Sequence, residues 1–281
     1  MTSYGAITVI NAIPCGIGAA VGIRLRTDAE FVVSGNERKV RIINDPDEDT
    51  KMAEICVRNT FNYFHIDEPK GWSLSVNSQI PISRGLKSSS SACNSIISAT
   101  AEWIRDTYGK EFGTGMNDVV EMIRLGVNCA KEANVTVTGA FDDACACHLG
   151  GFVMTDNHND TIIKQTAVKG YDVILFVPEK KIRKSSLSKE ELYKLSERMN
   201  EIIITAETDW IAALTENGKL IANALGIDDS IADAAMDIGA LAAGVSGTGP
   251  AVSVVVKKGT GNSFLKDLDH EGYEFIITGT R

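Results

Sequence analysis

The chain has 281 residues, enough for two domains, and its apolar content is that of a globular protein with a sizeable core. Its net charge of −9 argues against nucleic acid as a partner. No run of 18 apolar residues predicts a membrane span, residues 1–5 do not resemble a secretory signal, and the six cysteines contain no CxxC pair, so we expect free thiols in a cytoplasmic protein without a membrane partner.

The first half of the chain predicts a mixture of strands and helices. Apolar and β-branched runs indicate strands at residues 7–10, 21–25, 31–33, 40–43 and 72–76. We expect the third and fourth of these to form a hairpin around Ser34-Gly35-Asn36. Helical spacing of apolar side chains predicts helices over about residues 50–64, 92–108 and 117–132, and Gly150-Gly151 indicates a break.

The second half predicts five more strands and two helices. The strands are expected at residues 152–155, 161–168, 173–177, 251–256 and 273–277, and the helices at residues 190–217 and 231–243. Because strands and helices do not alternate regularly along the chain, the expected fold class is α+β rather than doubly wound α/β.

Four consecutive serines, Ser88–Ser91, stand directly before the helical pattern that begins at Ala92. Serine is a strong helix N-cap, and the free N–H groups and positive dipole end of a helix start attract anions, most naturally phosphate. Gly85 would let the backbone approach a ligand, and Lys87 adds a positive charge. The residue order is neither that of a Walker A loop nor that of a dinucleotide-binding loop. The alternative is a well-capped helix without a ligand.

Two carboxylates follow this segment, Glu132 at the end of a predicted helix and Asp143 eleven positions later. Near a phosphate site they suit magnesium-assisted phosphoryl transfer, in which Mg²⁺ takes oxygen ligands and a carboxylate orients the attacking hydroxyl and accepts its proton. Each also has a purely structural explanation. Glu132 could be an exposed helix residue, and Asp142-Asp143 could be a helix-capping pair.

Three further segments carry groups of chemical interest. The glycines of Ser246–Pro250 permit close approach to another loop or to a ligand, the alternative being a helix end followed by a turn. The basic cluster Lys180–Lys184 could close over phosphates or a carboxylate, or form a solvated loop. Cys145, Cys147 and His148 lack the second ligand pair of a zinc site, so we expect no metal there.

The order of these motifs resembles that of the GHMP kinases, the family of galactokinase, homoserine kinase, mevalonate kinase and phosphomevalonate kinase. Pro81-x-x-x-Gly85-Leu86-x-Ser88-Ser89-Ser90-Ser91-Ala92 resembles the phosphate-binding motif of the family. Pro14-x-Gly16-x-Gly18 stands where its first motif lies, and Val245–Ala251 resembles its third. The chain departs from the family at Lys87, where glycine is usual, and in its first motif.

Within this family the chain most resembles the archaeal-type shikimate kinases, through Ile10–Ile13, Ser83–Ser90, Gly139–Ala144 and the overall length. The resemblance implies a GHMP kinase fold, with an N-terminal ribosomal-protein-S5-like α/β domain over residues 1–150 and a C-terminal ferredoxin-like domain over residues 151–281. It also implies ATP-dependent phosphorylation of the 3-hydroxyl of shikimate, a step towards chorismate and the aromatic amino acids, with Mg²⁺ as cofactor. A homodimer is compatible with it.

The resemblance also implies roles for single residues. Asp143 is the catalytic residue, and Ser89 and Glu132 hold Mg²⁺. The ATP-binding residues are Pro81, Ile82, Ser83, Arg84, Gly85, Leu86, Lys87, Ser88, Ser89, Ser90 and Ser91. The substrate-binding residues are Asn11, Asp142, Arg183, Gly247 and Thr248, with Arg183 or Arg24 for the carboxylate.

Three points stay open at this stage. Either Asp142 or Asp143 could accept the proton. The substrate could be homoserine or another small alcohol, bound by a different set of pocket residues. A non-catalytic small-molecule sensor on the same scaffold is the alternative of another class, against which the presence of both Glu132 and Asp143 argues.

Overall fold

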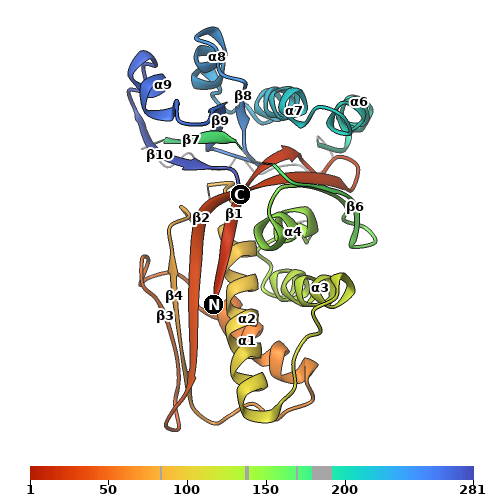
Figure 1. Ribbon diagram of the computed structural model, residues 1–281, viewed down its shortest axis with the longest axis vertical. Helices are drawn as coiled ribbons and strands as arrows, with labels where there is room; N and C mark the ends of the chain where they lie inside the picture. Colours follow the sequence, from red (N-terminus) through yellow and green to blue (C-terminus); the bar gives the residue numbers. More distant parts are fainter. Residues whose placement is uncertain (83, 137–138, 169, 179–191) are drawn as a thin grey trace.

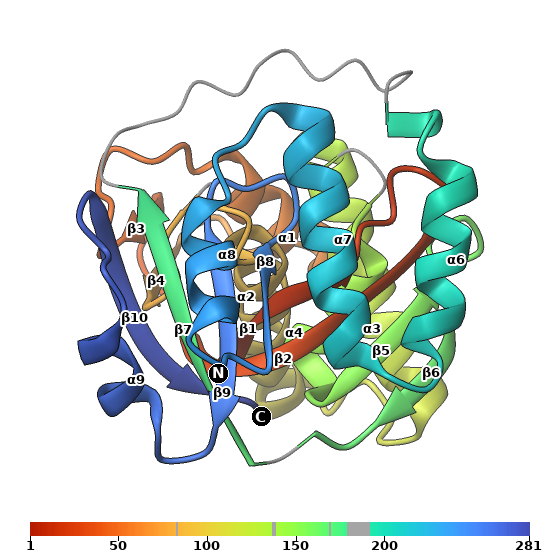
Figure 2. The same cartoon turned by 90° about the horizontal axis from the view of Figure 1, so that it is seen from above.

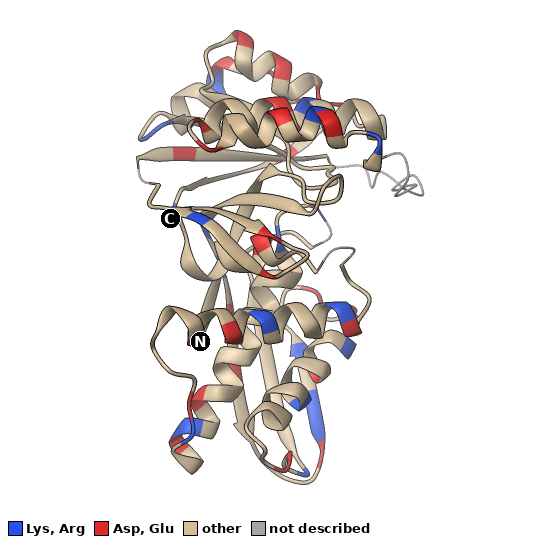
Figure 3. Cartoon of the chain, turned by 90° about the vertical axis from the view of Figure 1, so that its right-hand side faces the viewer, with Lys and Arg blue, Asp and Glu red and all other residues tan. Residues whose placement is uncertain are grey.

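The computed structural model of the chain describes residues 1–82, 84–136, 139–168, 170–178 and 192–281. Two sheets, each covered by helices, lie one above the other along the longest axis of the molecule (Figure 1). No helix among these described residues is both long and apolar enough to cross a membrane. Lys and Arg residues alternate with Asp and Glu residues along the ribbon in Figure 3.

The first sheet has six strands in the order β3-β4-β2-β5-β6, with β1 paired to β2. Its strands are β1 (Thr2–Ile10), β2 (Ile17–Val33), β3 (Arg38–Ile42), β4 (Trp72–Ser78), β5 (Phe152–Asp156) and β6 (Thr161–Thr166). With 17 residues, β2 is long enough to pair with β1, β4 and β5 along different parts of its length. It therefore organises this sheet.

The hairpin expected around Ser34-Gly35-Asn36 is wrong. The strand β4 lies between β2 and β3, antiparallel to β2 and parallel to β3. Trp72, at the start of β4, is only 1% exposed and stacks against the ring of Phe31 on β2, with 5.7 Å between the ring centroids. The short polar turn between β2 and β3 resembled a hairpin, but burial of Trp72 brings a later strand between them.

Four helices cover the first sheet on one side (Figure 1). They are α1 (Lys51–Tyr63), α2 (Ser88–Tyr108), α3 (Met116–Glu132) and α4 (Phe141–Leu149). A core of β2, β4, α1, α2 and α3 side chains includes the packed rings of Phe31, Phe61, Trp72 and Trp103. A second cluster joins α4 to β1, β2 and β5 and fixes the helix that carries Asp142 and Asp143.

The second sheet is antiparallel, with the order β10-β7-β9-β8. Its strands are β7 (Tyr171–Pro178), β8 (Ala242–Val245), β9 (Val252–Lys257) and β10 (Tyr273–Gly279). Alternate side chains of β7 enter different cores: Val173 and Leu175 pack with β1 and β2, whereas Ile174 and Phe176 pack with helices on the other face. The strand β7 is therefore buried on both faces, which explains its uninterrupted apolar sequence.

The helices of the second half are α6 (Ser196–Ala206), α7 (Trp210–Leu225), α8 (Ser230–Asp237) and α9 (Gly261–Asp267). Seen from above, α6, α7 and α8 lie over the sheets (Figure 2). The single helix expected over residues 190–217 is wrong, because Asp209 starts a new helix by accepting the N–H groups of Ile211 and Ala212 at 3.0 and 3.1 Å. The helix expected over residues 231–243 ends at Asp237, since β8 pairs with β9.

The change from the first sheet to the second occurs between Thr166 and Tyr171. Both β5 and β6 follow the expected domain boundary at residues 150 and 151, yet they pair within the first sheet. The chain also returns at its other end, where Arg281 N donates to Gly22 O at 2.9 Å. The division into residues 1–150 and 151–281 stays a prediction, but the sheets themselves interleave around it.

Candidate active site

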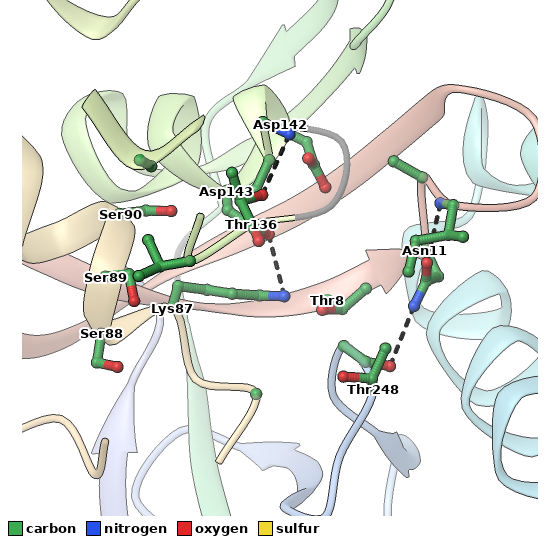
Figure 4. Close-up of a pocket in the computed structure, with 18 of the residues that line it drawn as sticks. Thr8, Asn11, Lys87, Ser88, Ser89, Ser90, Thr136, Asp142, Asp143 and Thr248 are labelled. Carbon is green, nitrogen blue, oxygen red and sulfur yellow. Dashed lines mark hydrogen bonds and ion pairs between the residues drawn. The ribbon is translucent and has the colours of Figure 1, made fainter. Parts of the chain in front are cut away.

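A cavity of about 350 Å³ lies where four separate stretches of the chain meet. It is lined by the end of β1 and the following turn, the start of α2, the α3–α4 connection and the loop after β8 (Figure 4). The volume is that of a pocket for a small molecule. The glycine-containing segments at Gly85 and Gly247 both contribute to its wall, and so do Asp142 and Asp143.

The turn before α2 is held by the loop after β8. Gly85 has a φ of +84°, and a Cβ atom there would lie 2.1 Å from the carbonyl oxygen of Ser246. Ser246 Oγ donates to Gly85 O at 2.8 Å, and Ala251 N donates to Arg84 O at 3.2 Å. The close approach expected of Ser246–Pro250 is thus made to the turn that is expected to bind phosphate, and only glycine fits at position 85.

The serines occupy the first turn of α2 rather than its cap. The helix begins at Ser88, and Lys87 takes the cap position in the left-handed conformation, with a φ of 68° and no side-chain cap hydrogen bond. The expectation of a serine N-cap is therefore wrong. Ser88, Ser89 and Ser90 line the cavity instead, with the start of the helix beside them. This combination of hydroxyls and free N–H groups suits a phosphate.

The other expected ATP residues are dispersed around this turn. Leu86 is 1% exposed within the core, and Ser91 is fully buried. Ile82 lines a second, smaller cavity of about 110 Å³, while Pro81 and Arg84 line neither cavity. Ser83 lies outside the described residues.

The smaller cavity adjoins the larger one at the start of α2. Its apolar wall consists of Ile42, Met52, Ala53, Val76, Ile82, Ala92, Ile96, Ala133 and Val135. Ser88 and Ser89 line both cavities, together with Val135. A ligand with a flat apolar part and a chain of phosphates could therefore occupy the smaller cavity and extend into the larger one.

Asp143 enters the larger cavity from the first turn of α4. Its Oδ1 atom lies 3.1 Å from Nζ of Lys87, and the two side chains are only 13% and 8% exposed. Burial, followed by the adjacent charge of Asp142, raises the pKa of Asp143 to about 7, against the opposing effect of Lys87. A carboxyl with such a pKa can accept a proton at neutral pH.

Asp142 is fixed by a different set of contacts. Its Oδ1 accepts from Asn157 Nδ2 at 2.7 Å, and its own N–H donates to Asn157 Oδ1 at 3.3 Å. A Cβ atom on Gly18 would lie 2.5 Å from the Asp142 carboxyl, so the glycine of the first motif makes room for it. The network favours Asp143 as the proton acceptor, with Asp142 as its charged neighbour.

Glu132 lies outside the wall of the larger cavity. Its side chain is 47% exposed, pairs with Arg58 and accepts from Asn59 Nδ2 at 2.8 Å. The hydrogen bond from Asn59, followed by the charge of Arg58, lowers its pKa. Ala130, two residues earlier, does line the cavity, and two steps along a helix rotate a side chain by about 200°. The structure therefore does not bring Glu132 to Ser89.

The remaining predicted residues divide into three groups. Asn11, Gly247 and Thr248 line the larger cavity, and Asn11 Nδ2 donates to Gly247 O at 3.2 Å (Figure 4). Arg24 is elsewhere, donating from Nε to Thr280 O at 3.1 Å. Arg183 and the rest of Lys180–Lys184 lie outside the described residues.

Sequence reasoning missed Thr8, Thr136 and Asn157. Thr8 and Thr136 line the cavity, and Asn157 connects Asp142 to the turn after β1 by donating its backbone N–H to Gly16 O at 2.8 Å. Thr8 lies in an apolar strand and Asn157 in a polar turn, so neither carried a local signal. Only the pairing of β5 with β2 brings Asn157 to α4.

The oxygen atoms around the start of α2 fit Mg²⁺ that arrives with phosphates. No group of three or more His, Cys, Asp or Glu residues in the described ranges could hold a metal by itself. The hydroxyls of Ser88, Ser89 and Ser90, which line the cavity, are hard oxygen donors. Mg²⁺ usually takes one or two protein oxygens and completes its shell with phosphates and water.

Comparison with known proteins shows the family of the chain. Residues 51–151 match the family model for the GHMP kinases N terminal domain. The shikimate kinase of Methanothrix thermoacetophila is 38% identical over 276 residues, which are 98% of this chain and 91% of the relative. The shikimate kinase of Pyrococcus abyssi is 34% identical over 250 residues, covering 88% of this chain and 87% of the relative.

Solved structures share the fold at low identity. The mevalonate kinase of Methanococcus jannaschii matches with a TM-score of 0.80 and 18% identity, covering 100% of this chain and 98% of the other. The galactokinase of Lactococcus lactis, solved with galactose, matches with a TM-score of 0.73 and 15% identity, covering 99% and 92%. The chain belongs to the GHMP kinase family, in the group of the archaeal shikimate kinases.

Proposed function

We propose that the protein transfers the γ-phosphoryl group of ATP to the 3-hydroxyl of shikimate, as a kinase of aromatic amino acid biosynthesis. One observation carries the proposal: a proton-accepting carboxylate, Asp143, and the uncapped start of α2 face the same small cavity. Relatives that bear the name shikimate kinase match nearly the whole chain. The site is thus equipped for phosphoryl transfer, and the relatives indicate the acceptor.

The two cavities accommodate the two parts of ATP. The triphosphate lies at Ser88, Ser89 and Ser90, where helix N–H groups and hydroxyls face the cavity. The base lies in the apolar smaller cavity. Because Ser88 and Ser89 line both, the phosphates extend from one to the other.

The reaction needs correct placement more than strong base chemistry. The 3-hydroxyl oxygen forms a bond to the γ-phosphorus while the bond from that phosphorus to the bridging oxygen breaks, and ADP leaves. The hydroxyl proton passes to Asp143, whose pKa of about 7 suits this acceptor role. Asn11, Asp142, Gly247 and Thr248 are proposed to surround the alcohol, and Arg183 to bind its carboxylate.

Mg²⁺ is proposed to accompany ATP and to neutralise negative charge on its phosphates. Ser89 is the proposed protein ligand that faces the cavity. The second proposed ligand, Glu132, is held by Arg58 and Asn59 in the structure, and its role stays a prediction. A cytoplasmic location is also proposed, in keeping with the six free cysteines.

The test is an ADP-release assay of the purified protein with shikimate, homoserine or mevalonate, each with and without MgCl₂. Turnover with shikimate, dependent on Mg²⁺, is expected. Turnover with homoserine alone would overturn the acceptor and leave the kinase chemistry intact. ATP binding without turnover on any of the three alcohols would favour a sensor.

A further inference from the structure

Lys87 joins three distant parts of the chain inside the larger cavity. Its Nζ atom lies 3.1 Å from Asp143 Oδ1 on α4, and it would lie 3.1 Å from a Cβ atom placed on Gly247 in the loop after β8. Lys87 itself belongs to the phosphate-binding turn. Figure 4 shows its side chain extending across the cavity, away from Ser88 and towards Asp143.

The left-handed backbone conformation of Lys87 directs its side chain towards Asp143, and this conformation costs free energy. A non-glycine residue with a φ of 68° is in the left-handed region, which costs roughly 1–2 kcal/mol. Glycine would adopt the same conformation without strain. A strained lysine at a position where glycine fits better indicates that its side chain has a role.

The surroundings of Asp143 indicate what the role of the Lys87 side chain is. The Asp142 carboxylate precedes it on α4, and the buried Cys147 thiol lies one turn further along. Of the elements packed against α4, β1 and β2 contribute alanines, β5 a valine and α3 apolar side chains, while α2 contributes Asn94, whose Nδ2 donates to Ala144 O at 2.9 Å. The nearby Lys131 pairs with Asp160. Among the described residues that line the cavity, Lys87 is the one cation.

We propose that Lys87 is a positioning residue for the phosphoryl transfer, whose ammonium group favours the ionised form of the Asp143 carboxyl and aims it at the acceptor hydroxyl. Lys87 thereby interacts with the proton acceptor, Asp143, as well as with the triphosphate. This inference rests on the proposed function. The phosphate-binding turn and the proton acceptor are thereby connected through one ion pair. Loss of the ammonium group leaves Asp143 buried beside Asp142 without a counter-charge, so the carboxyl takes up a proton.

The test compares three variants with the wild type. Lys87→Gly keeps the turn and removes the side chain, Lys87→Met keeps most of its volume without charge, and Lys87→Arg keeps the charge. His65→Gly is the control, since His65 also has a left-handed backbone, with a φ of 52°, on the exposed end of α1. Steady-state rates against pH and carbon-13 NMR titration of the Asp143 carboxyl in the ligand-free protein are measured.

Lys87→Gly and Lys87→Met are expected to lower kcat at pH 7 at least 100-fold and to change the KM for ATP less than threefold. The acidic limb of their rate profile, and the titration of Asp143, should move up by at least one pH unit, and Lys87→Arg should regain at least a tenth of the rate. His65→Gly should match the wild type.

A tenfold rise in the KM for ATP, with the acidic limb of the pH–rate profile unchanged, would overturn the inference. Lys87 would then contact only the phosphates. An unmoved Asp143 titration in both uncharged variants would overturn it as well. If the wild type fails to phosphorylate shikimate, the proposed function fails. The NMR titration, which needs no substrate, then still decides the role of Lys87.

Discussion

The acidity of Asp143 follows from its surroundings rather than from its residue type. Its carboxyl is nearly buried, follows another carboxylate in sequence and has a single ammonium group as counter-charge within the described part of the site. The first two influences favour the protonated form and the third the ionised one. The balance makes this group a proton acceptor near neutral pH and a source of instability above it.

Asp143→Asn is expected to lower kcat about a thousandfold, because general-base assistance is worth 10²–10⁴-fold. The dissociation constant for ATP should change less than threefold, because the proposed triphosphate site lies at the start of α2. Steady-state kinetics and calorimetric titration of ATP measure the two quantities. Asp233→Asn, in an exposed pair with Lys219, is the matched control and should leave both unchanged. Equal losses in rate and affinity would contradict the role of Asp143.

The raised pKa of Asp143 also predicts how stability depends on pH. Between about pH 4 and pH 7 the folded protein keeps a proton that the unfolded chain has lost, so the free energy of unfolding falls as pH rises through this window. Asp143→Asn removes this contribution. The variant should be more stable than the wild type at pH 8, by up to about 3 kcal/mol, and the difference should shrink towards pH 4. Urea unfolding across this range measures it, and a difference independent of pH would contradict the assignment.

At the scale of single elements, the start of α4 is fixed by a residue outside it. Asn157, which follows β5, holds both the backbone and the side chain of Asp142, and its Oδ1 also accepts from Thr155 Oγ1 at 2.6 Å. The sheet thereby fixes the angle at which α4 presents Asp143. The helix also packs against Ala6 of β1 and Ala20 of β2, with the ring of Phe141 buried in the same cluster.

Asn157→Ala should therefore lower kcat about tenfold and destabilise the fold by about 1–3 kcal/mol, since it leaves buried polar groups unpaired. Asn159→Ala is the matched control, because Asn159 lies in the same turn but is exposed and donates to Asp156. Kinetics and thermal unfolding of both variants provide the comparison. A rate for Asn157→Ala equal to that of the control would show that α4 is held by packing alone.

The same scale shows how far sequence reasoning reached. Helices α1, α2 and α3 and most strands were predictable, because their apolar side chains recur with the period of a helix or of a strand. The position of β4 between β2 and β3 and the break at Asp209 depend on partners far along the chain or on one capping carboxylate. The motifs around Gly85, Asp143 and Gly247 did meet at one cavity, whereas the side-chain directions of Lys87 and Glu132 required the three-dimensional structure.

At the scale of the whole molecule, the turn before α2 meets the loop after β8 at Gly85 and Ser246. A side chain at position 85 would collide with the backbone of the loop after β8 and separate the phosphate-binding turn from Gly247 and Thr248. The cavity forms because Gly85 has no Cβ atom and can contact the loop after β8. The shape of the cavity therefore depends on both the N-terminal and the C-terminal half of the chain.

Gly85→Ala should lower both stability and activity severely, by about 3 kcal/mol or more and at least 100-fold, because steric overlap adds to left-handed strain. Gly35→Ala is the control: it has a φ of +62° but nothing within 4 Å of the added atom, so it should cost only about 1 kcal/mol. Thermal unfolding and turnover of the two variants are compared. Equal destabilisation would show that strain rather than the collision limits position 85.

The two adjoining cavities draw their walls from different parts of the chain, apart from the shared start of α2 and Val135. The smaller one is made largely by β3, β4, α1 and α2, and the larger one by β1, α4 and the loop after β8. Substitutions in β1, α4 or the loop after β8 can therefore reshape the proposed alcohol site while the wall of the proposed base site stays unchanged.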